Sequence, residues 1–154
     1  MVKGQANKLI ATGPEQVFEF VAVNFEQNYR RWSPEVKELE MLTPGPVRLG
    51  TRARQVRVDQ GRQSKTNFRV TAFDPPNRIS FAESTDQFRI DYQIEPLGTQ
   101  TRLTFTFELR RMELYMRPFE KLIRVAIQDG AERVVRNIKG LIERELARQP
   151  SGQV

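Results

Sequence analysis

Two charged residues, Arg54 and Glu83, are the best candidates for chemistry in this sequence of 154 residues. Each lies in a segment whose apolar residues alternate with polar ones, and in both segments the charged residue shares the predicted inward face of a strand. A charge in an apolar groove is costly unless it meets an opposite charge or a ligand. Glu83, with a pKa raised by burial, would then act as a general acid or base, and Arg54 would stabilise an enolate. The alternative is that one strand end lies at the rim and that water solvates these charges.

Neither histidine nor cysteine occurs in the chain. Their absence excludes Ser-His-Asp and Cys-His catalysis, the usual zinc sites, disulfides and histidine-ligated haem. We therefore expect no metal and no cofactor. Any reaction would have to use Asp, Glu, Lys, Arg, Tyr, Ser or Thr side chains.

The chain is basic, with a net charge of +6 and a pI of about 10.1. Its arginines are spread along the sequence without a block of like charges or a nucleic-acid-binding motif, which argues against nucleic acid as a partner. We expect a solvated basic surface, with a specific polyanion site as the alternative.

No apolar run approaches the length of a membrane span, and residues 1–7 lack the apolar core of a signal peptide. We therefore expect a cytoplasmic protein without a transmembrane segment, and peripheral membrane contact is left open. The sequence does not determine the oligomeric state.

The middle of the chain alternates apolar and polar residues with period two, interrupted by turn signals. This pattern predicts six antiparallel strands after a first strand near residues 2–11, joined by short loops. One face of the resulting sheet should be covered and the other wet. The six strands are predicted near residues 36–42, 51–58, 64–73, 78–83, 88–95 and 101–110.

Helices are predicted on both sides of these strands. Two short ones should follow the first strand, near residues 14–21 and 24–32. Residues 117–147 carry apolar residues mostly three or four apart, which predicts one helix of roughly 45 Å, long enough to need an extended surface beneath it. We predict a single domain over residues 1–148 and a flexible tail over residues 149–154.

Five short motifs follow one another within this framework: residues 12–18 (TGPEQVF), 32–36 (WSPEV), 49–52 (LGTR), 73–79 (FDPPNRI) and 101–104 (TRLT). In their order and spacing the chain resembles the START-like superfamily, also called SRPBCC, and in particular its polyketide cyclase/dehydrase-like branch. The resemblance covers nearly the whole chain. It implies an α+β helix-grip fold, in which a seven-stranded curved antiparallel sheet, with two short helices after the first strand, wraps around a long C-terminal helix. It also implies a cavity for an apolar or amphipathic molecule between sheet and helix.

Such a cavity would be lined by inward-facing aromatic residues and by the N-terminal half of the long helix. Arg54, Glu83 and the tyrosine hydroxyls would form its polar end. Gly130 would mark a close approach of the sheet or room for a ligand, or else a mild bend of the helix. The alternative for the aromatic residues is that they fill the space as ordinary core. The predicted ligand-binding residues are Tyr29, Trp32, Arg54, Phe68, Phe81, Glu83, Tyr92, Phe105, Phe107, Tyr115, Phe119, Ile123, Ile127 and Gly130.

These features favour a protein that binds an apolar or amphipathic small molecule, with transport or presentation left open, and that does not catalyse a reaction. One alternative is a polyketide cyclase or dehydratase that uses Glu83 and Arg54 without metal or cofactor. A second alternative is a basic adaptor that docks on a membrane surface, on RNA or on a ribosome.

Overall fold

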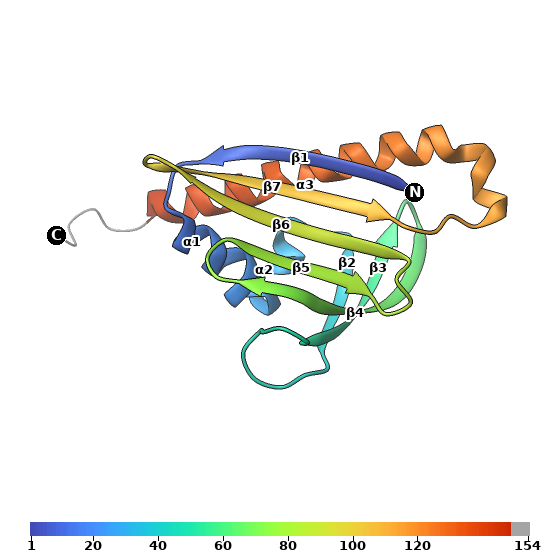
Figure 1. Cartoon of the computed structure of the whole chain (residues 1–154), viewed down its shortest axis with the longest axis horizontal. Coiled ribbons are helices and arrows are strands. Elements are labelled where there is room, and N and C mark those ends of the chain that lie inside the picture. The colour runs from blue at the N-terminus through green and yellow to red at the C-terminus, as the bar shows by residue number, and fades with distance from the viewer. Residues whose placement is uncertain (149–154) are drawn as a thin grey trace.

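Seven antiparallel strands form one curved sheet in the computed structural model, which describes residues 1–148 (Figure 1). Across the sheet the order is β1-β7-β6-β5-β4-β3-β2, so β1 and β2 are the two edges. The predicted helix-grip fold is confirmed, whereas the predicted tail, residues 149–154, lies outside the described residues. The strands are β1 Val2–Ile10, β2 Val36–Met41, β3 Arg52–Asp59, β4 Arg62–Asp74, β5 Arg78–Glu83, β6 Phe88–Leu97 and β7 Gln100–Leu109.

Short helices connect β1 to the rest of the sheet: α1 (Pro14–Phe18), the π-helical turn η1 (Glu19–Val23) and α2 (Phe25–Trp32). The long helix α3 (Glu120–Arg148) follows the 3-10 segment η2 (Leu114–Phe119). Pro118 lies inside η2, where its missing N–H is tolerated at the start of a longer helix. Within residues 1–148, none of these helices is both long and apolar enough to cross a membrane.

Helix α3 runs along the edge strand β1, and its polar side chains satisfy the strand's free backbone groups. Gln128 Nε2 donates to the carbonyl of Gln5 at 2.9 Å, and Gln128 Oε1 accepts from the N–H of Gln5 at 3.1 Å. Further along, Lys139 donates to the carbonyl of Leu9 at 2.6 Å. An edge strand covered in this way does not offer its backbone to another chain.

Helix and sheet come into tight contact at Gly4 on β1. A Cβ at this position would lie 2.7 Å from Cγ2 and 2.9 Å from the carbonyl oxygen of Ile127, so only glycine fits without movement of the helix. The predicted close approach at Gly130 is wrong, because a Cβ there would meet only the end of the Arg133 side chain, at 3.8 Å. The contact between α3 and β1 therefore requires a glycine at Gly4 on the strand, and it does not require one at Gly130 on the helix.

Helix α3 packs into the core from Ala131 onward, through Ala131, Val135, Ile138 and Ile142. The start of α3, together with η2, extends past the end of β1 (Figure 1). This overhang leaves one end of the grip open.

Replacement of Gly4 by alanine should therefore push α3 away from β1 and lower the free energy of unfolding by about 1–3 kcal/mol. Gly140→Ala is the matched control, because Gly140 lies inside α3 and a methyl group added there would meet only the end of the Arg144 side chain, at 4.0 Å. That control should raise the free energy of unfolding by up to about 1 kcal/mol, since alanine favours the helix. Urea unfolding measures both, and a neutral Gly4→Ala would contradict the proposed tight contact.

Candidate functional site

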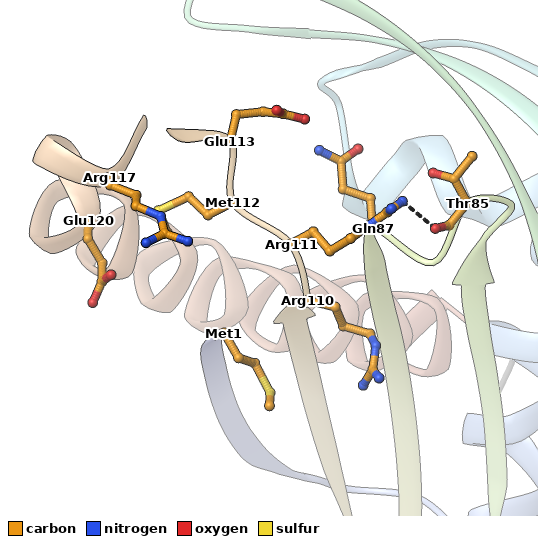
Figure 2. A pocket seen from close by; sticks show the side chains of 9 residues that line it. All are labelled: Met1, Thr85, Gln87, Arg110, Arg111, Met112, Glu113, Arg117 and Glu120. Carbon is orange, nitrogen blue, oxygen red and sulfur yellow. Dashed lines mark hydrogen bonds between the residues drawn. The ribbon is translucent and has the colours of Figure 1, made fainter. Parts of the chain in front are cut away.

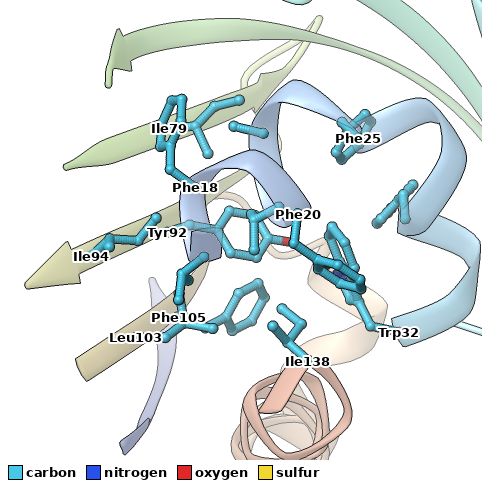
Figure 3. Packing of buried hydrophobic residues seen from close by; sticks show 14 of the residues in the cluster. Phe18, Phe20, Phe25, Trp32, Ile79, Tyr92, Ile94, Leu103, Phe105 and Ile138 are labelled. Carbon is cyan, nitrogen blue, oxygen red and sulfur yellow. Dashed lines mark hydrogen bonds between the residues drawn. The ribbon is translucent and has the colours of Figure 1, made fainter. Parts of the chain in front are cut away.

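Aromatic side chains fill the space between the sheet and the short helices (Figure 3). Helix α2 presents Phe25, Tyr29 and Trp32 on one face, because they are spaced three or four residues apart. Phe25 lies 4.9 Å from Phe81 on β5, measured between ring centroids, and Tyr29 lies 6.3 Å from Phe68 on β4. This aromatic interior is therefore built jointly by α2 and the concave face of the sheet.

Four polar groups are embedded in the aromatic interior, and each has a partner. Trp32 Nε1 donates to the hydroxyl of Tyr92 at 3.3 Å, and the hydroxyl of Tyr29 donates to Gln55 Oε1 at 2.7 Å. Gln55 Nε2 in turn donates to the hydroxyl of Thr66 at 3.0 Å. Burial raises the pKa of both tyrosine hydroxyls, so they stay neutral donors and acceptors at physiological pH.

The inward register of β3 brings Gln55 and Arg57 to this interior, and it directs Arg54 to the opposite face. The prediction for Arg54 is wrong: its guanidinium is exposed and forms an ion pair with Glu40 on β2. The prediction assumed that Val56 and Val58 face inward together with Arg54. Both valines are only half-buried, and they lie on the outer face of the sheet. Gln55 and Arg57 were not predicted to face inward. The only indication in the sequence is that they share the strand face of Ala53, a small residue that is buried.

Arg57 lies at the edge of the aromatic interior, on the side where water reaches it. Its guanidinium donates to Asp59 at 3.1 and 3.2 Å, and it is close enough to Tyr29 to oppose the pKa increase that burial causes there. An arginine beside a buried hydroxyl can hold a negatively charged or carbonyl-bearing group.

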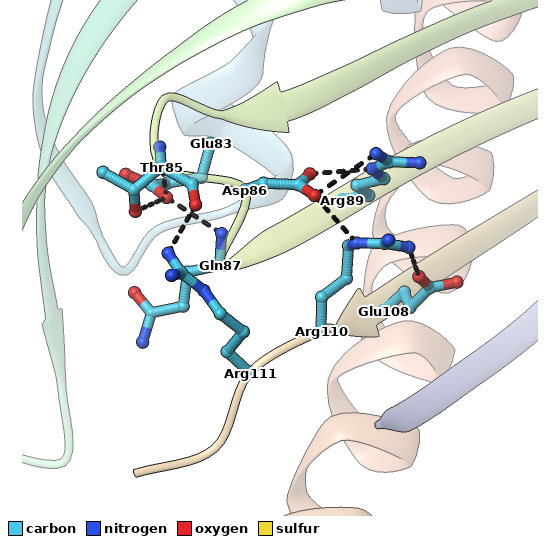
Figure 4. A network of polar contacts seen from close by, with 8 residues as sticks. All are labelled: Glu83, Thr85, Asp86, Gln87, Arg89, Glu108, Arg110 and Arg111. Carbon is cyan, nitrogen blue, oxygen red and sulfur yellow. Dashed lines mark hydrogen bonds and ion pairs between the residues drawn. The ribbon is translucent and has the colours of Figure 1, made fainter.

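Glu83 is buried, as predicted, but its carboxylate caps the turn between β5 and β6 (Figure 4). Its Oε1 accepts from the N–H of Thr85 at 2.9 Å, from the hydroxyl of Thr85 at 2.5 Å and from the N–H of Gln87 at 3.1 Å. Burial alone would raise the pKa of Glu83, but these bonds and the charge of Arg111 outweigh it and lower that pKa. The predicted raised pKa is wrong, and Glu83 and Arg54 do not meet.

Little empty space remains inside the aromatic interior. A cavity of about 10 Å³ lies among Phe25, Tyr29, Gln55 and the inward residues of β4 to β6, which is room for about one water molecule. The aromatic residues thus pack as core in this state. Phe88 and Ile90, which also line the cavity, are only half-buried and separate it from solvent.

A wider depression of about 760 Å³ lies at the open end of the grip (Figure 2). We call it the mouth; it is lined by Met1, Thr85, Gln87, Arg110, Arg111, Met112, Glu113, Arg117 and Glu120. Arg110 is paired with Asp86 and Glu108, and Arg111 donates to the carbonyl of Thr85. The mouth is therefore mainly polar, with three arginines and two glutamates among its lining residues.

The predicted ligand-binding residues fall into three groups, and their role in binding stays a prediction. The buried group belongs to the aromatic interior or to the turn beside it: Tyr29, Trp32, Phe68, Phe81, Glu83, Tyr92 and Phe105. The half-buried group follows the open part of the grip: Phe107, Ile123, Ile127 and Gly130. The exposed group lines no enclosed cavity: Arg54, Tyr115 and Phe119. Among residues 1–148, no group of three acidic side chains is placed to hold a metal ion.

Replacement of Glu83 by glutamine should lower the free energy of unfolding by about 1–3 kcal/mol at pH 7, because the turn loses charge-assisted hydrogen bonds. A carboxyl with a lowered folded-state pKa stabilises the fold above its unfolded pKa of about 4.3, and this contribution is lost as pH falls through the folded pKa. The difference between variant and wild type should therefore shrink at pH 3. Urea unfolding at both pH values measures it.

Glu40→Gln is the control, since it removes only the exposed pair with Arg54 and should cost less than about 1 kcal/mol. An equal loss for Glu83→Gln at pH 3 and pH 7 would contradict a role for the ionised carboxylate.

Comparison with solved structures shows the same fold along nearly the whole chain, whereas the sequence matches none of the curated proteins. TTHA0849 from Thermus thermophilus is 20% identical with a TM-score of 0.73, covering 96% of this chain and 99% of that chain. Zhui aromatase/cyclase from Streptomyces sp. R1128 is 15% identical with a TM-score of 0.74, covering 99% and 98%. A START superfamily protein from Mycobacterium smegmatis is 17% identical with a TM-score of 0.69, covering 93% and 98%.

The sequence itself matches a protein family described as "Polyketide cyclase / dehydrase and lipid transport" over residues 1–143. This match spans every strand of the sheet and most of α3. It confirms the resemblance carried by the five sequence motifs. The chain belongs to the polyketide cyclase / dehydrase and lipid transport family.

Proposed function

We propose that this protein binds an apolar or amphipathic small molecule on the concave face of the sheet, beneath the N-terminal half of α3. The observation that carries the proposal is an aromatic surface that continues from the closed interior to the open end of the grip. Family membership supports a hydrophobic ligand in general terms.

This continuous surface is formed by β6 and β7. Phe88 stacks on Phe107 with ring centroids 5.4 Å apart, and both rings are half-buried. Ile90 is the next inward residue of β6 and also borders the small cavity. A ligand that displaces Phe88 and Ile90 would join the cavity to solvent while keeping apolar contacts on every side.

The polar end of the ligand would meet Arg57 and the hydroxyl of Tyr29. Tyr29 lines the small cavity from α2, and Arg57 on β3 lies close to its hydroxyl, which Gln55 orients. Their chemistry suits a carboxylate, a phenolate or a carbonyl on an otherwise apolar molecule.

Cyclase chemistry finds less support in this arrangement. Zhui is described as an aromatase/cyclase, and a similar fold permits that activity here. However, Arg54 lies on the outer face of the sheet, and Glu83 lies in a turn where three hydrogen bonds already engage one oxygen of its carboxylate, Oε1. Binding is therefore the function that the geometry favours.

Native mass spectrometry of protein purified without detergent, followed by a thermal-shift screen of fatty acids, quinones and aromatic acids, should reveal a bound or stabilising molecule. Binding to the native state raises the melting temperature by mass action. A chain that carries no co-purified molecule and is stabilised by none of these classes would contradict the proposal.

Arg57→Ala should weaken binding of the anionic probes 2-naphthoate and oleate by about tenfold, as expected for the loss of one charge-assisted hydrogen bond. Their neutral counterparts 2-naphthol and oleyl alcohol should be affected much less. Arg54→Ala is the matched control, because this arginine lies three residues away on the outer face. Isothermal titration calorimetry measures all of these affinities.

An equal effect of Arg54→Ala and Arg57→Ala would contradict the assigned register of the site. An equal effect of Arg57→Ala on charged and neutral probes would contradict its role at the polar end.

A further inference from the structure

We propose that η2 and the first turns of α3 form a docking surface for an anionic lipid membrane. Large apolar side chains on this segment are turned to water, although the same helix buries its apolar residues further on. We call this set the apolar ridge; it consists of Leu114 (77% exposed), Tyr115 (64%), Phe119 (57%), Leu122 (69%) and Val125 (59%).

The apolar ridge is unusual within this protein because its members are neighbours. Other exposed large apolar residues, such as Val23 and Leu49, lie singly on different elements. Phe119 and Leu122 are three residues apart and share a side of the helix, and Tyr115 lies one turn before Phe119. A contiguous exposed apolar patch on a protein surface marks an interaction site.

The position of the apolar ridge suits a flat partner. Residues 114–125 lie on the part of the chain that extends past the end of β1, away from the body of the sheet (Figure 1). A projecting helix can reach into the interfacial layer of a membrane without a clash between the sheet and the lipids. Tyrosine and phenylalanine are favoured at that depth, and Tyr115 and Phe119 supply them.

The charges beside the apolar ridge identify the partner as anionic. Arg117 and Lys121 have no hydrogen-bonded or ion-paired partner among residues 1–148, and Arg111 lies at the adjoining mouth. Two acidic residues lie beside the apolar ridge: Glu120, which is engaged by Arg124 at 3.2 Å, and Glu113, which lines the mouth. The four cations Arg111, Arg117, Lys121 and Arg124 outnumber them. Unpaired cations beside exposed apolar side chains match the two requirements of an interfacial helix on anionic lipid.

A second copy of the chain fits this surface less well. In a two-fold symmetric contact the apolar ridge would meet itself, and Arg117 and Lys121 of both copies would be brought to the same interface. Like charges brought together in this way oppose association, whereas lipid phosphates neutralise them.

Docking would also place the mouth against the membrane. Arg117 and Glu120 belong both to the docking segment and to the lining of the mouth, as Figure 2 shows. The open end of the grip would then face the lipid, although the docking proposal does not depend on a ligand inside the protein.

Cosedimentation with vesicles tests this proposal. Wild-type protein should bind phosphatidylcholine vesicles that contain about one third phosphatidylglycerol, at least about tenfold more tightly than vesicles of phosphatidylcholine alone. Phe119→Ser and Leu122→Ser should each weaken this binding about tenfold or more, because each removes one inserted apolar side chain. Leu49→Ser is the matched control, since Leu49 is as exposed (66%) but lies on the loop between β2 and β3.

A site-specific probe provides a second measurement, because the chain has no cysteine of its own. An environment-sensitive dye attached to Leu122→Cys should shift its emission to the blue on addition of the anionic vesicles. The same dye on Leu49→Cys should not shift.

Absence of cosedimentation, equal effects of Leu49→Ser and Leu122→Ser, or equal dye shifts at both positions would overturn the proposal. Light scattering that shows a dimer in solution, lost on Phe119→Ser, would instead assign the apolar ridge to a second copy and would equally overturn it.

Discussion

The contact between α3 and the edge strand β1 is the constraint on which the other features depend. It combines a steric requirement, the absence of a side chain at Gly4 against Ile127, with the paired amide bonds between Gln128 and the backbone of Gln5. The hydrogen bonds fix the position of α3 along β1, and the absence of a side chain at Gly4 fixes the distance between the helix and the strand. Because its position and its distance relative to β1 are both fixed, α3 covers only the side of the concave face next to β1.

The uncovered side of the concave face is where α2 packs. Its aromatic residues reach across to β4 and β5 and leave only enough space for about one water molecule. The space between sheet and helices, where the family resemblance implies a cavity, is here filled by the protein's own side chains. Binding of a larger molecule would therefore have to displace side chains, and among those that line the small cavity Phe88 and Ile90 are half-buried.

The sequence predicted the architecture well because periodicity and turn signals report which face of each element is apolar. The prediction was wrong at β3. The valines of this strand suggested that their face is buried, whereas the structure buries the opposite face, which carries Ala53 and Gln55. A shift of one residue inverts every side chain on a strand, so Arg54 was assigned inward and Arg57 was missed. Long-range pairing with β4 decides that register, and local sequence does not contain it.

Glu83 shows a different limit of sequence reasoning. Its burial was predicted from alternation along β5, yet its chemistry is set by the next four residues, which turn two N–H groups and a hydroxyl toward the carboxylate. Burial without partners raises the pKa of a carboxyl, while burial with three donors lowers it. The turn geometry that distinguishes these cases is visible only in three dimensions.

Helix α3 has two parts that carry different surfaces on one continuous element. From Ala131 onward the helix packs apolar residues against the core, whereas its start continues beyond the end of β1 with Leu122 and Val125 exposed. Leaving Phe119 and Leu122 in water does not stabilise the isolated fold. In the docking proposal their contribution comes from the membrane, and because the helix is held close to β1 at Gly4, the membrane would meet the overhang in a defined orientation relative to the mouth.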